Sequence, residues 1–255
     1  MSLHEIRHSL RCVKELMTLH VHPWGRASMQ LLTELRDAHA GRRCFIMGNG
    51  PSLRKMDLVR LKAEYTFGLN RIYLLFPEVG FQTTFLVSVN HLVLRQCAAE
   101  ILSYPMPKFL PWSSRSYLPV KRPLNTAFFD FVCAKPHFST DVRKPIWHGA
   151  TVTYTALQLA FHMGFSQVIL IGVDHNFITQ GPAGKAIVSQ GDDLNHFSSD
   201  YFGKGFRWEL PDLQTSEIGY GMARKAFEEA GRQVLDATAG GKLTIFPKVD
   251  YKSLF

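Results

Sequence analysis

The organisation of this chain follows from residues 43–53, which read Arg43-Cys-Phe-Ile-Met-Gly-Asn-Gly-Pro-Ser-Leu53. The apolar run from Cys44 to Met47 predicts a short buried strand, and the turn 48–52 separates it from a charged helical stretch, residues 53–61. Strand, glycine turn and helix in this order place free backbone N–H groups at the end of a sheet, where the helix dipole favours an anion. We therefore expect the turn to bind a phosphate or another anion; an ordinary tight turn is the alternative.

Each residue of this turn has a physical use in an anion site. Gly48 and Gly50 permit positive φ and let a ligand approach the backbone. Asn49 offers a donor and an acceptor, Pro51 fits the first helical position, and Ser52 can cap nearby N–H groups. The turn matches neither the dinucleotide fingerprint nor a Walker A loop.

Composition indicates a globular protein with an anionic partner. The chain has 255 residues, of which 46% are hydrophobic and 20% charged, enough for one large domain or one domain with a helical appendage. Its formal charge of +8 and pI of about 9.4 favour nucleotides, sugar phosphates or an acidic surface. The basic residues are scattered, so we expect no nucleic-acid partner.

The four cysteines, Cys12, Cys44, Cys97 and Cys133, lie far apart and have no C-x-x-C spacing. They form neither a disulfide framework nor a zinc pattern and suit a reducing cytoplasm. The first twenty residues lack a signal-peptide pattern, and no apolar run reaches the roughly 18 residues of a membrane span. We expect a cytoplasmic protein, with peripheral association at the inner membrane face as the alternative.

Two amphipathic segments precede the first strand. Residues 4–20 and 27–40 have helical apolar spacing, and the break between them reads His22-Pro-Trp-Gly25. We predict a helical hairpin, forming an N-terminal extension over residues 1–41 ahead of a single domain over residues 42–255. A dimerisation or membrane-surface role for the hairpin is the alternative.

Three apolar runs each end in an asparagine. Asn49 follows the first strand, Asn70 follows the run 65–69, and Asn90 follows the run 85–89. Ligands of open α/β sheets bind beyond the carboxyl ends of the strands, where these carboxamides could read a base, a ribose or a sugar. The alternative is that asparagine favours turns and caps.

The remaining elements complete an alternating pattern. Proline-rich loops occupy residues 103–147 and include short strands at 108–111 and 128–132; a helix at 149–164, a strand at 167–172, a helix at 217–230 and a strand at 233–237 follow. This alternation predicts an α/β fold with an open, mainly parallel Rossmann-like sheet and helices on both faces.

Two later segments carry further candidate site residues. Thr151 begins the helix after Gly149, and the strand 167–172 leads into Asp174, His175 and Asn176, of which Asp174 could hold a metal, a ribose hydroxyl or a loop N–H. We assign all four to the ligand edge of the sheet.

The polar loop 178–216 is the candidate catalytic element. In it His196 could act as a general base, and Lys204 and Arg207 could neutralise a phosphate. A surface loop with aromatic anchors is the alternative.

These motifs, taken in order, carry a family resemblance. Over roughly residues 42–250 the chain resembles the 6-hydroxymethylpterin diphosphokinase MptE-like family, and it is similar to the bacterial CMP-sialic-acid-dependent sialyltransferases. The resemblance rests on Gly48-Asn-Gly-Pro-Ser-Leu53, Gly68-Leu-Asn-Arg71, the helix from Gly149, and Val168-Ile-Leu-Ile-Gly-Val-Asp-His-Asn176.

The resemblance implies roles for individual residues. Asn49, Ser52 and Asn70 would bind a cytidine nucleotide, and Asn90 would face the ribose or donor sugar. His196 would be the general base, with His175 as its rival. Tyr201 is the candidate for a phosphate-stabilising tyrosine. After the corresponding strand the sialyltransferases continue into a tyrosine, whereas this chain continues into Asp174-His175-Asn176. This departure puts sialic acid as the donor sugar in question.

The resulting expectation is a transferase with a nucleotide-activated donor. The favoured reading is a CMP-sugar glycosyltransferase of surface polysaccharide synthesis that needs no cofactor and acts on a small-molecule or glycan acceptor, alone or as a homo-oligomer. One alternative is a diphosphokinase that uses ATP and Mg²⁺, with Asp174 near the metal, on a pterin-like hydroxymethyl compound. Another is a non-catalytic nucleotide-binding scaffold.

Overall fold

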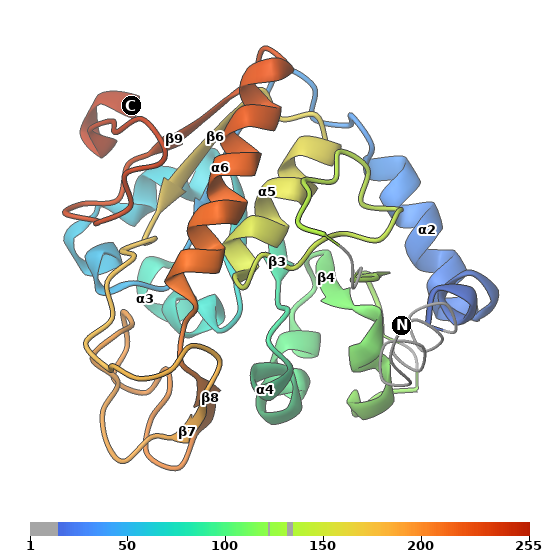
Figure 1. The fold of residues 1–255 in the computed structure, drawn as a ribbon, viewed down its shortest axis with the longest axis horizontal. Helices are drawn as coiled ribbons and strands as arrows, with labels where there is room; N and C mark the ends of the chain where they lie inside the picture. The colour runs from blue at the N-terminus through green and yellow to red at the C-terminus, as the bar shows by residue number, and fades with distance from the viewer. Residues whose placement is uncertain (1–14, 122, 132–134) are drawn as a thin grey trace.

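The computed structural model describes residues 15–121, 123–131 and 135–255, and its centre is a seven-stranded parallel sheet (Figure 1). In the order β5-β4-β3-β2-β1-β6-β9, every neighbouring pair of strands is parallel. The strands are β1 (Arg43–Met47), β2 (Tyr65–Leu69), β3 (Phe85–Val87), β4 (Lys108–Pro111), β5 (Thr126–Phe129), β6 (Gln167–Ile171) and β9 (Gln233–Asp236). The sheet is open, which confirms the predicted fold class.

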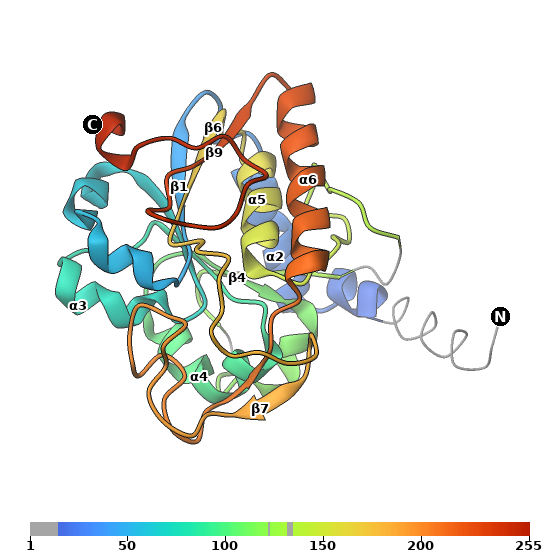
Figure 2. The same cartoon turned by 60° about the vertical axis from the view of Figure 1, so that its left-hand side comes forward.

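Helices cover both faces of the sheet (Figure 2). The first face packs on α2 (Pro23–Leu35), α5 (Val152–His162) and α6 (Leu213–Glu229). The second packs on α4 (His91–Ser103), α3 (Phe76–Val79) and short 3-10 helices at Pro51–Lys55, Leu58–Ala63, Ile72–Leu75, Trp112–Tyr117 and Tyr251–Leu254. Along β1 the side chains alternate, so Cys44 and Ile46 enter the first core while Phe45 and Met47 enter the second.

The strand order reverses between β1 and β6. Met47 pairs with Ile171, so the turns that leave the two strands lie side by side. The Gly48 N–H donates to the Ile171 carbonyl and the Gly50 N–H donates to the Gly172 carbonyl, both at 2.8 Å. Such a reversal opens the crevice in which ligands of open α/β sheets bind.

The N-terminal helices differ from their predicted bounds. A helix was predicted over residues 27–40, but α2 begins at Pro23, a residue that suits the first helical position, and ends at Leu35. Asp37 then takes a positive φ of 54°. Of the helix predicted at 4–20, residues 15–21 are helical, and residues 1–14 of the predicted hairpin lie outside the described residues.

Two other predictions were wrong in detail. The single helical stretch predicted at 53–61 is two 3-10 helices, which turn Leu53, Leu58 and Leu61 toward the same core. The helix predicted at 217 begins at Leu213, because the Asp212 side chain accepts from the Thr215 N–H at 2.9 Å.

The segment predicted as a loop at 178–216 contains an antiparallel hairpin. Its strands, β7 (Ala186–Val188) and β8 (Arg207–Glu209), form a separate two-stranded sheet beside α4 (Figure 1). Short, half-exposed strands give a weak sequence signal. The hairpin lies near the carboxyl ends of the main strands.

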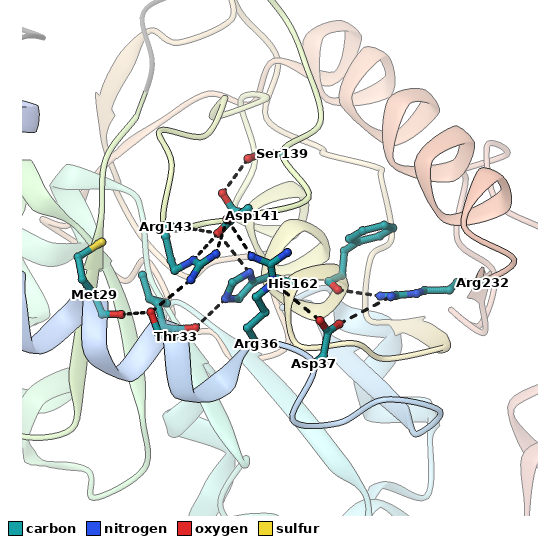
Figure 3. A network of polar contacts seen from close by, with 11 residues as sticks. Met29, Thr33, Arg36, Asp37, Ser139, Asp141, Arg143, His162 and Arg232 are labelled. Atoms are coloured by element: carbon teal, nitrogen blue, oxygen red, sulfur yellow. Dashed lines mark hydrogen bonds and ion pairs between the residues drawn. The ribbon is translucent and has the colours of Figure 1, made fainter.

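A polar network fixes the segment after β5 onto α2 and α5 (Figure 3). Arg143 donates to both oxygens of Asp141, at 2.9 and 2.7 Å, and Arg36 reaches Asp141 at 3.4 Å. The buried His162 bonds the Leu32 carbonyl at 2.8 Å. The hydrogen bonds from Arg143 hold the pKa of Asp141 well below its usual range.

No helix among the described residues is long and apolar enough to cross a membrane.

Candidate active site

A cavity of about 210 Å³ opens at the reversal of strand order. It is lined by the turns after the central strands, the first turn of α5, part of the loop before β8 and the start of α6. The structure brings eleven of the predicted site residues together there: Gly48, Asn49, Gly50, Asn70, Asn90, Thr151, Asp174, His175, Asn176, His196 and Tyr201.

The two glycines of the first turn are needed for close approach. A Cβ on Gly48 would lie 2.3 Å from the Gly172 carbonyl oxygen, and one on Gly50 would lie 1.8 Å from Asp174 Oδ2. Neither glycine has the positive φ that the sequence suggested, and Gly50 has φ −69°. Glycine is therefore required at these two positions because there is no room for a Cβ atom.

Ser52 faces Asp174 and does not line the cavity. Its N–H donates to Asp174 Oδ1 at 3.1 Å, and its hydroxyl donates to Oδ2 at 2.7 Å. Burial raises the pKa of Asp174, and the two hydrogen bonds from Ser52 oppose that rise. Pro51 begins the short 3-10 helix, also outside the lining. The Ser52–Asp174 pair fixes the glycine turn to the segment that follows β6.

The three asparagines have different environments. The Asn49 Oδ1 atom is buried and makes no hydrogen bond within the described part of the chain. Asn70 has φ 47° and accepts from the Ser88 hydroxyl at 3.1 Å. Asn90 caps α4, since its Oδ1 accepts from the first N–H groups of that helix, and its Nδ2 donates to Glu209 Oε2 at 3.4 Å. Asn49 therefore has the strongest need for a ligand or water partner.

The N-terminus of α5 forms another part of the cavity wall. Gly149 and Ala150 have φ of 59° and 55°, and Thr151 caps the helix by accepting from the Thr153 N–H at 3.3 Å. The leading N–H groups of a helix lack intrahelical acceptors, and the dipole makes this end favourable for an anion. Ala150, Thr151 and Val152 all line the cavity.

His196 is held by a buried carboxylate that the sequence reasoning missed. Its Nδ1 lies 2.7 Å from Asp193 Oδ2, and its ring stacks on Tyr201 with centroids 4.0 Å apart. The Nε2 atom makes no hydrogen bond to the described residues. Asp193 stands three residues before His196, and this short spacing was the available signal.

His175, the rival base, also has a carboxylate partner. Its Nε2 lies 2.8 Å from Glu217 Oε1 on α6, and its backbone has φ 52°. The Glu217 side chain is 52% exposed, whereas that of Asp193 is 2% exposed. The two histidines therefore differ in which ring nitrogen is bonded to a carboxylate: Nδ1 in His196 and Nε2 in His175.

Arg71 anchors the loop that carries Tyr201. Its guanidinium donates to the backbone carbonyls of Asp200 and Tyr201 and lies 5.0 Å from the centre of the Phe206 ring. The Tyr201 hydroxyl accepts from the Arg71 N–H at 3.4 Å, and burial raises the pKa of this phenol well above its usual range. The phenol is therefore neutral at physiological pH.

Lys204 and Arg207 lie outside the cavity. Both are exposed, and the Arg207 backbone exchanges hydrogen bonds with the Gln96 side chain on α4. Their role as phosphate partners stays a prediction. The lining residues that were not predicted from the sequence include His148, Trp208 and Glu209. Burial lowers the pKa of His148, and the Trp208 Nε1 is buried with no partner in the described residues.

Together these features define a Rossmann-like α/β protein with its candidate ligand site at the point where the strand order reverses. The 6-hydroxymethylpterin diphosphokinase MptE-like family model matches residues 25–180, and the chain belongs to that family. No curated protein matches the sequence.

Solved structures with related folds include glycosyltransferases. The MAf glycosyltransferase from Magnetospirillum magneticum AMB-1 aligns over 90% of this chain with a TM-score of 0.53 and 15% identity. The aligned part is 39% of that protein's length, so this chain spans about two fifths of it. A mammalian sialyltransferase in complex with Gal-beta-1-3GalNAc-ortho-nitrophenol aligns over 91% of this chain and 86% of its own, with a TM-score of 0.38 and 11% identity. The alignment with the MAf glycosyltransferase shows that this chain shares the fold of part of that protein.

Proposed function

We propose that this protein is a glycosyltransferase that takes a sugar from a nucleotide-activated donor, with a CMP-sugar as the favoured donor. One observation carries the proposal: the Gly48–Gly50 turn, the N-terminus of α5 and His196 line the same cavity, and the Nδ1 atom of His196 is bonded to Asp193. This places an anion-binding surface beside a general base. Surface polysaccharide synthesis is the process to which we assign it.

The cavity offers backbone groups that suit a phosphate. The N–H groups of Gly48 and Gly50 are already engaged by the carbonyls of Ile171 and Gly172. The donors offered to a phosphate are therefore the leading N–H groups of α5, which also supplies the positive end of its dipole. Backbone groups of this kind bind phosphate without a basic side chain.

The charge of the lining bears on the charge of the donor. The described lining holds the three histidines His148, His175 and His196 but neither Lys nor Arg. The lining also holds the carboxylates of Asp174 and Glu209. A helix N-terminus, equivalent to about half a positive charge, offsets part of the single charge of a phosphodiester, whereas a triphosphate requires much more positive charge. This lining therefore favours a monophosphate-linked donor.

The transfer itself follows. The acceptor oxygen forms a bond to the anomeric carbon of the donor sugar as the bond from that carbon to the phosphate oxygen breaks. The electron pair of the broken bond leaves with the nucleoside monophosphate, and the acceptor's hydroxyl proton passes to Nε2 of His196. The N-terminus of α5 stabilises the charge that develops on the departing phosphate.

The diphosphokinase alternative is favoured by the family match and by Asp174 at the cavity wall. Both Asp174 oxygens already accept hydrogen bonds from Ser52, and no group of three His, Cys, Asp or Glu in the described ranges is arranged to hold a metal. The residues present therefore fit a resident Mg²⁺ poorly, and we derive no step through one.

A thermal-shift titration with CMP, CDP, ATP and GTP, each with and without Mg²⁺, separates these functions. A ligand that binds only the folded state raises the free energy of unfolding by about 2.7 kcal/mol at a hundredfold excess over Kd. We expect stabilisation by CMP without metal, lost in Asn49→Ala and retained in the exposed-loop control Gln190→Ala. Stabilisation by ATP only with Mg²⁺ would favour the diphosphokinase.

Turnover then tests the chemistry. We expect release of CMP from CMP-sialic acid in the presence of galactoside acceptors, with His196→Ala abolishing release while CMP still stabilises the variant. CMP binding without turnover of any CMP-sugar would support the scaffold instead.

A further inference from the structure

We infer that Asp193 is the positioning residue that fixes His196 as its Nδ1–H tautomer, so that Nε2 is the base and His175 is not; this rests on the function proposed above. Two histidines that line the cavity each have a carboxylate partner, His196 in Asp193 and His175 in Glu217. Only their surroundings distinguish them.

The Asp193 carboxylate is immobilised on three sides. Its Oδ1 accepts from the Asn195 N–H at 2.8 Å, and its Oδ2 accepts from the Phe202 N–H at 3.0 Å as well as bonding His196 at 2.7 Å. The side chain is 2% exposed. A carboxylate held by two backbone donors is an acceptor only, so the His196 nitrogen that faces it carries the proton.

The His196 ring is also fixed by stacking. It lies nearly parallel to the Tyr201 ring, with an interplanar angle of 14°, and meets the Phe202 ring edge-on at 4.9 Å. A base must be held in the right orientation before the substrate arrives. Ring stacking and the Asp193 bond together fix the direction in which Nε2 points.

The second pair lacks this support. Glu217 is half exposed on α6, and none of the described residues besides His175 bonds its side chain. Solvent screens such a pair and leaves the long side chain free to change rotamer. The exposed Glu217 carboxylate therefore fixes the tautomer of His175 less firmly than Asp193 fixes that of His196, which makes His175 the poorer base.

The experiment pairs Asp193→Asn with the matched substitution Glu217→Gln. Two-bond ¹H–¹⁵N spectra of the full chain labelled at histidine report the tautomer, and His196→Gln assigns the ring signals. We expect the Nδ1–H form for neutral His196 in the wild type and in Glu217→Gln, and its loss in Asp193→Asn. An Nε2–H form in the wild type, or an unchanged ring in Asp193→Asn, overturns the inference; the wild-type spectrum decides this even where a variant does not fold.

Kinetics with CMP-sialic acid provide the second arm. We expect kcat to fall by about 10²-fold in Asp193→Asn with little change in KM, and to stay within about twofold of wild type in Glu217→Gln. Equal losses in the two variants overturn the inference. Absence of turnover of any CMP-sugar by the wild type, together with the expected tautomer, overturns the proposed function while the pairing of Asp193 with His196 stands.

Discussion

The backbone N–H of Phe197 donates to the backbone carbonyl of Asn49 at 2.8 Å. This bond joins the glycine turn to the loop that carries His196. The Arg54 Nε atom donates to the Phe197 carbonyl at 2.7 Å, so both backbone groups of Phe197 are engaged by the segment after β1. Movement of the turn is therefore transmitted to the residue next to the proposed base.

Arg54→Ala should loosen this loop selectively. The Arg54–Glu78 ion pair is exposed, so we expect global stability to fall by no more than about 1 kcal/mol. Cleavage within residues 190–206 should accelerate in limited proteolysis followed by mass spectrometry. Arg60→Ala, which breaks an exposed ion pair with Asp57, is the control. Identical cleavage rates in the two variants would contradict the coupling.

Gly50→Ala should damage the turn itself. The added Cβ would overlap Asp174 Oδ2, and we expect the free energy of unfolding to fall by about 1–3 kcal/mol because the backbone must shift. Stabilisation by CMP should be lost as well. Gly191→Ala is the control, because a Cβ there meets no atom within 4 Å. Chemical denaturation measures both; an unaffected Gly50→Ala variant would refute the close approach.

Asp130 should make the protein less stable as pH rises. Burial raises its pKa to about 6 in the folded state, so the folded state binds this proton more tightly than the unfolded chain does. The stabilisation is present below about pH 4 and is lost as pH rises through about 6. Asp130→Asn should therefore be more stable than wild type at pH 8 and similar at pH 4, in thermal melts against pH. Asp192→Asn, in an exposed loop, should show no such crossover.

Asp141 should behave in the opposite sense. Arg143 holds its pKa below the usual range, so its stabilisation is present at neutral pH and declines as pH falls below about 4. Asp141→Asn should cost about 1–3 kcal/mol at pH 7, since it weakens hydrogen bonds to a charged partner.

The same network supplies the control for Asp141 (Figure 3). Asp37 is 58% exposed and lies 3.8 and 3.9 Å from its arginine partners, Arg36 and Arg232. Urea titrations at pH 7 measure the free energy of unfolding of both variants. Asp37→Asn should lower it by less than about 1 kcal/mol. A larger loss for Asp37→Asn than for Asp141→Asn would show that the bidentate pair does not dominate the network.

Strands buried on both faces could be predicted from the sequence. β2 and β4 have the predicted bounds, and β1, β6 and β9 lie within one residue of them, because parallel strands read as continuous apolar runs between turn residues. The bounds of the other two strands were wrong: β3 ends at Val87 and not at residue 89, and β5 is Thr126–Phe129 and not 128–132. The 3-10 helices and the β7–β8 hairpin could not be predicted. Their residues gain stability from tertiary contacts and carry no strong periodicity of their own.

In the candidate site, too, some residues could be predicted from the sequence and others could not. Residues after strand ends, such as Asn49 and Asp174, could be placed because parallel strands bring their carboxyl ends to one edge. Loop residues could not be placed by type. Lys204 and Arg207 have suitable charge but lie outside the cavity, while Asp193 reaches His196 only through the path of the loop.

The strand order also has a consequence for synthesis on the ribosome. β1 lies between β2 and β6, and β6 is the partner that positions the glycine turn. At bacterial-to-eukaryotic elongation rates, β1 waits on the order of ten seconds before β6 emerges. During that interval one edge of a strongly apolar strand is unpaired, which makes the nascent chain a substrate for chaperones and a point of aggregation. The topology that creates the cavity thereby also leaves this edge of β1 unpaired until β6 has been synthesised.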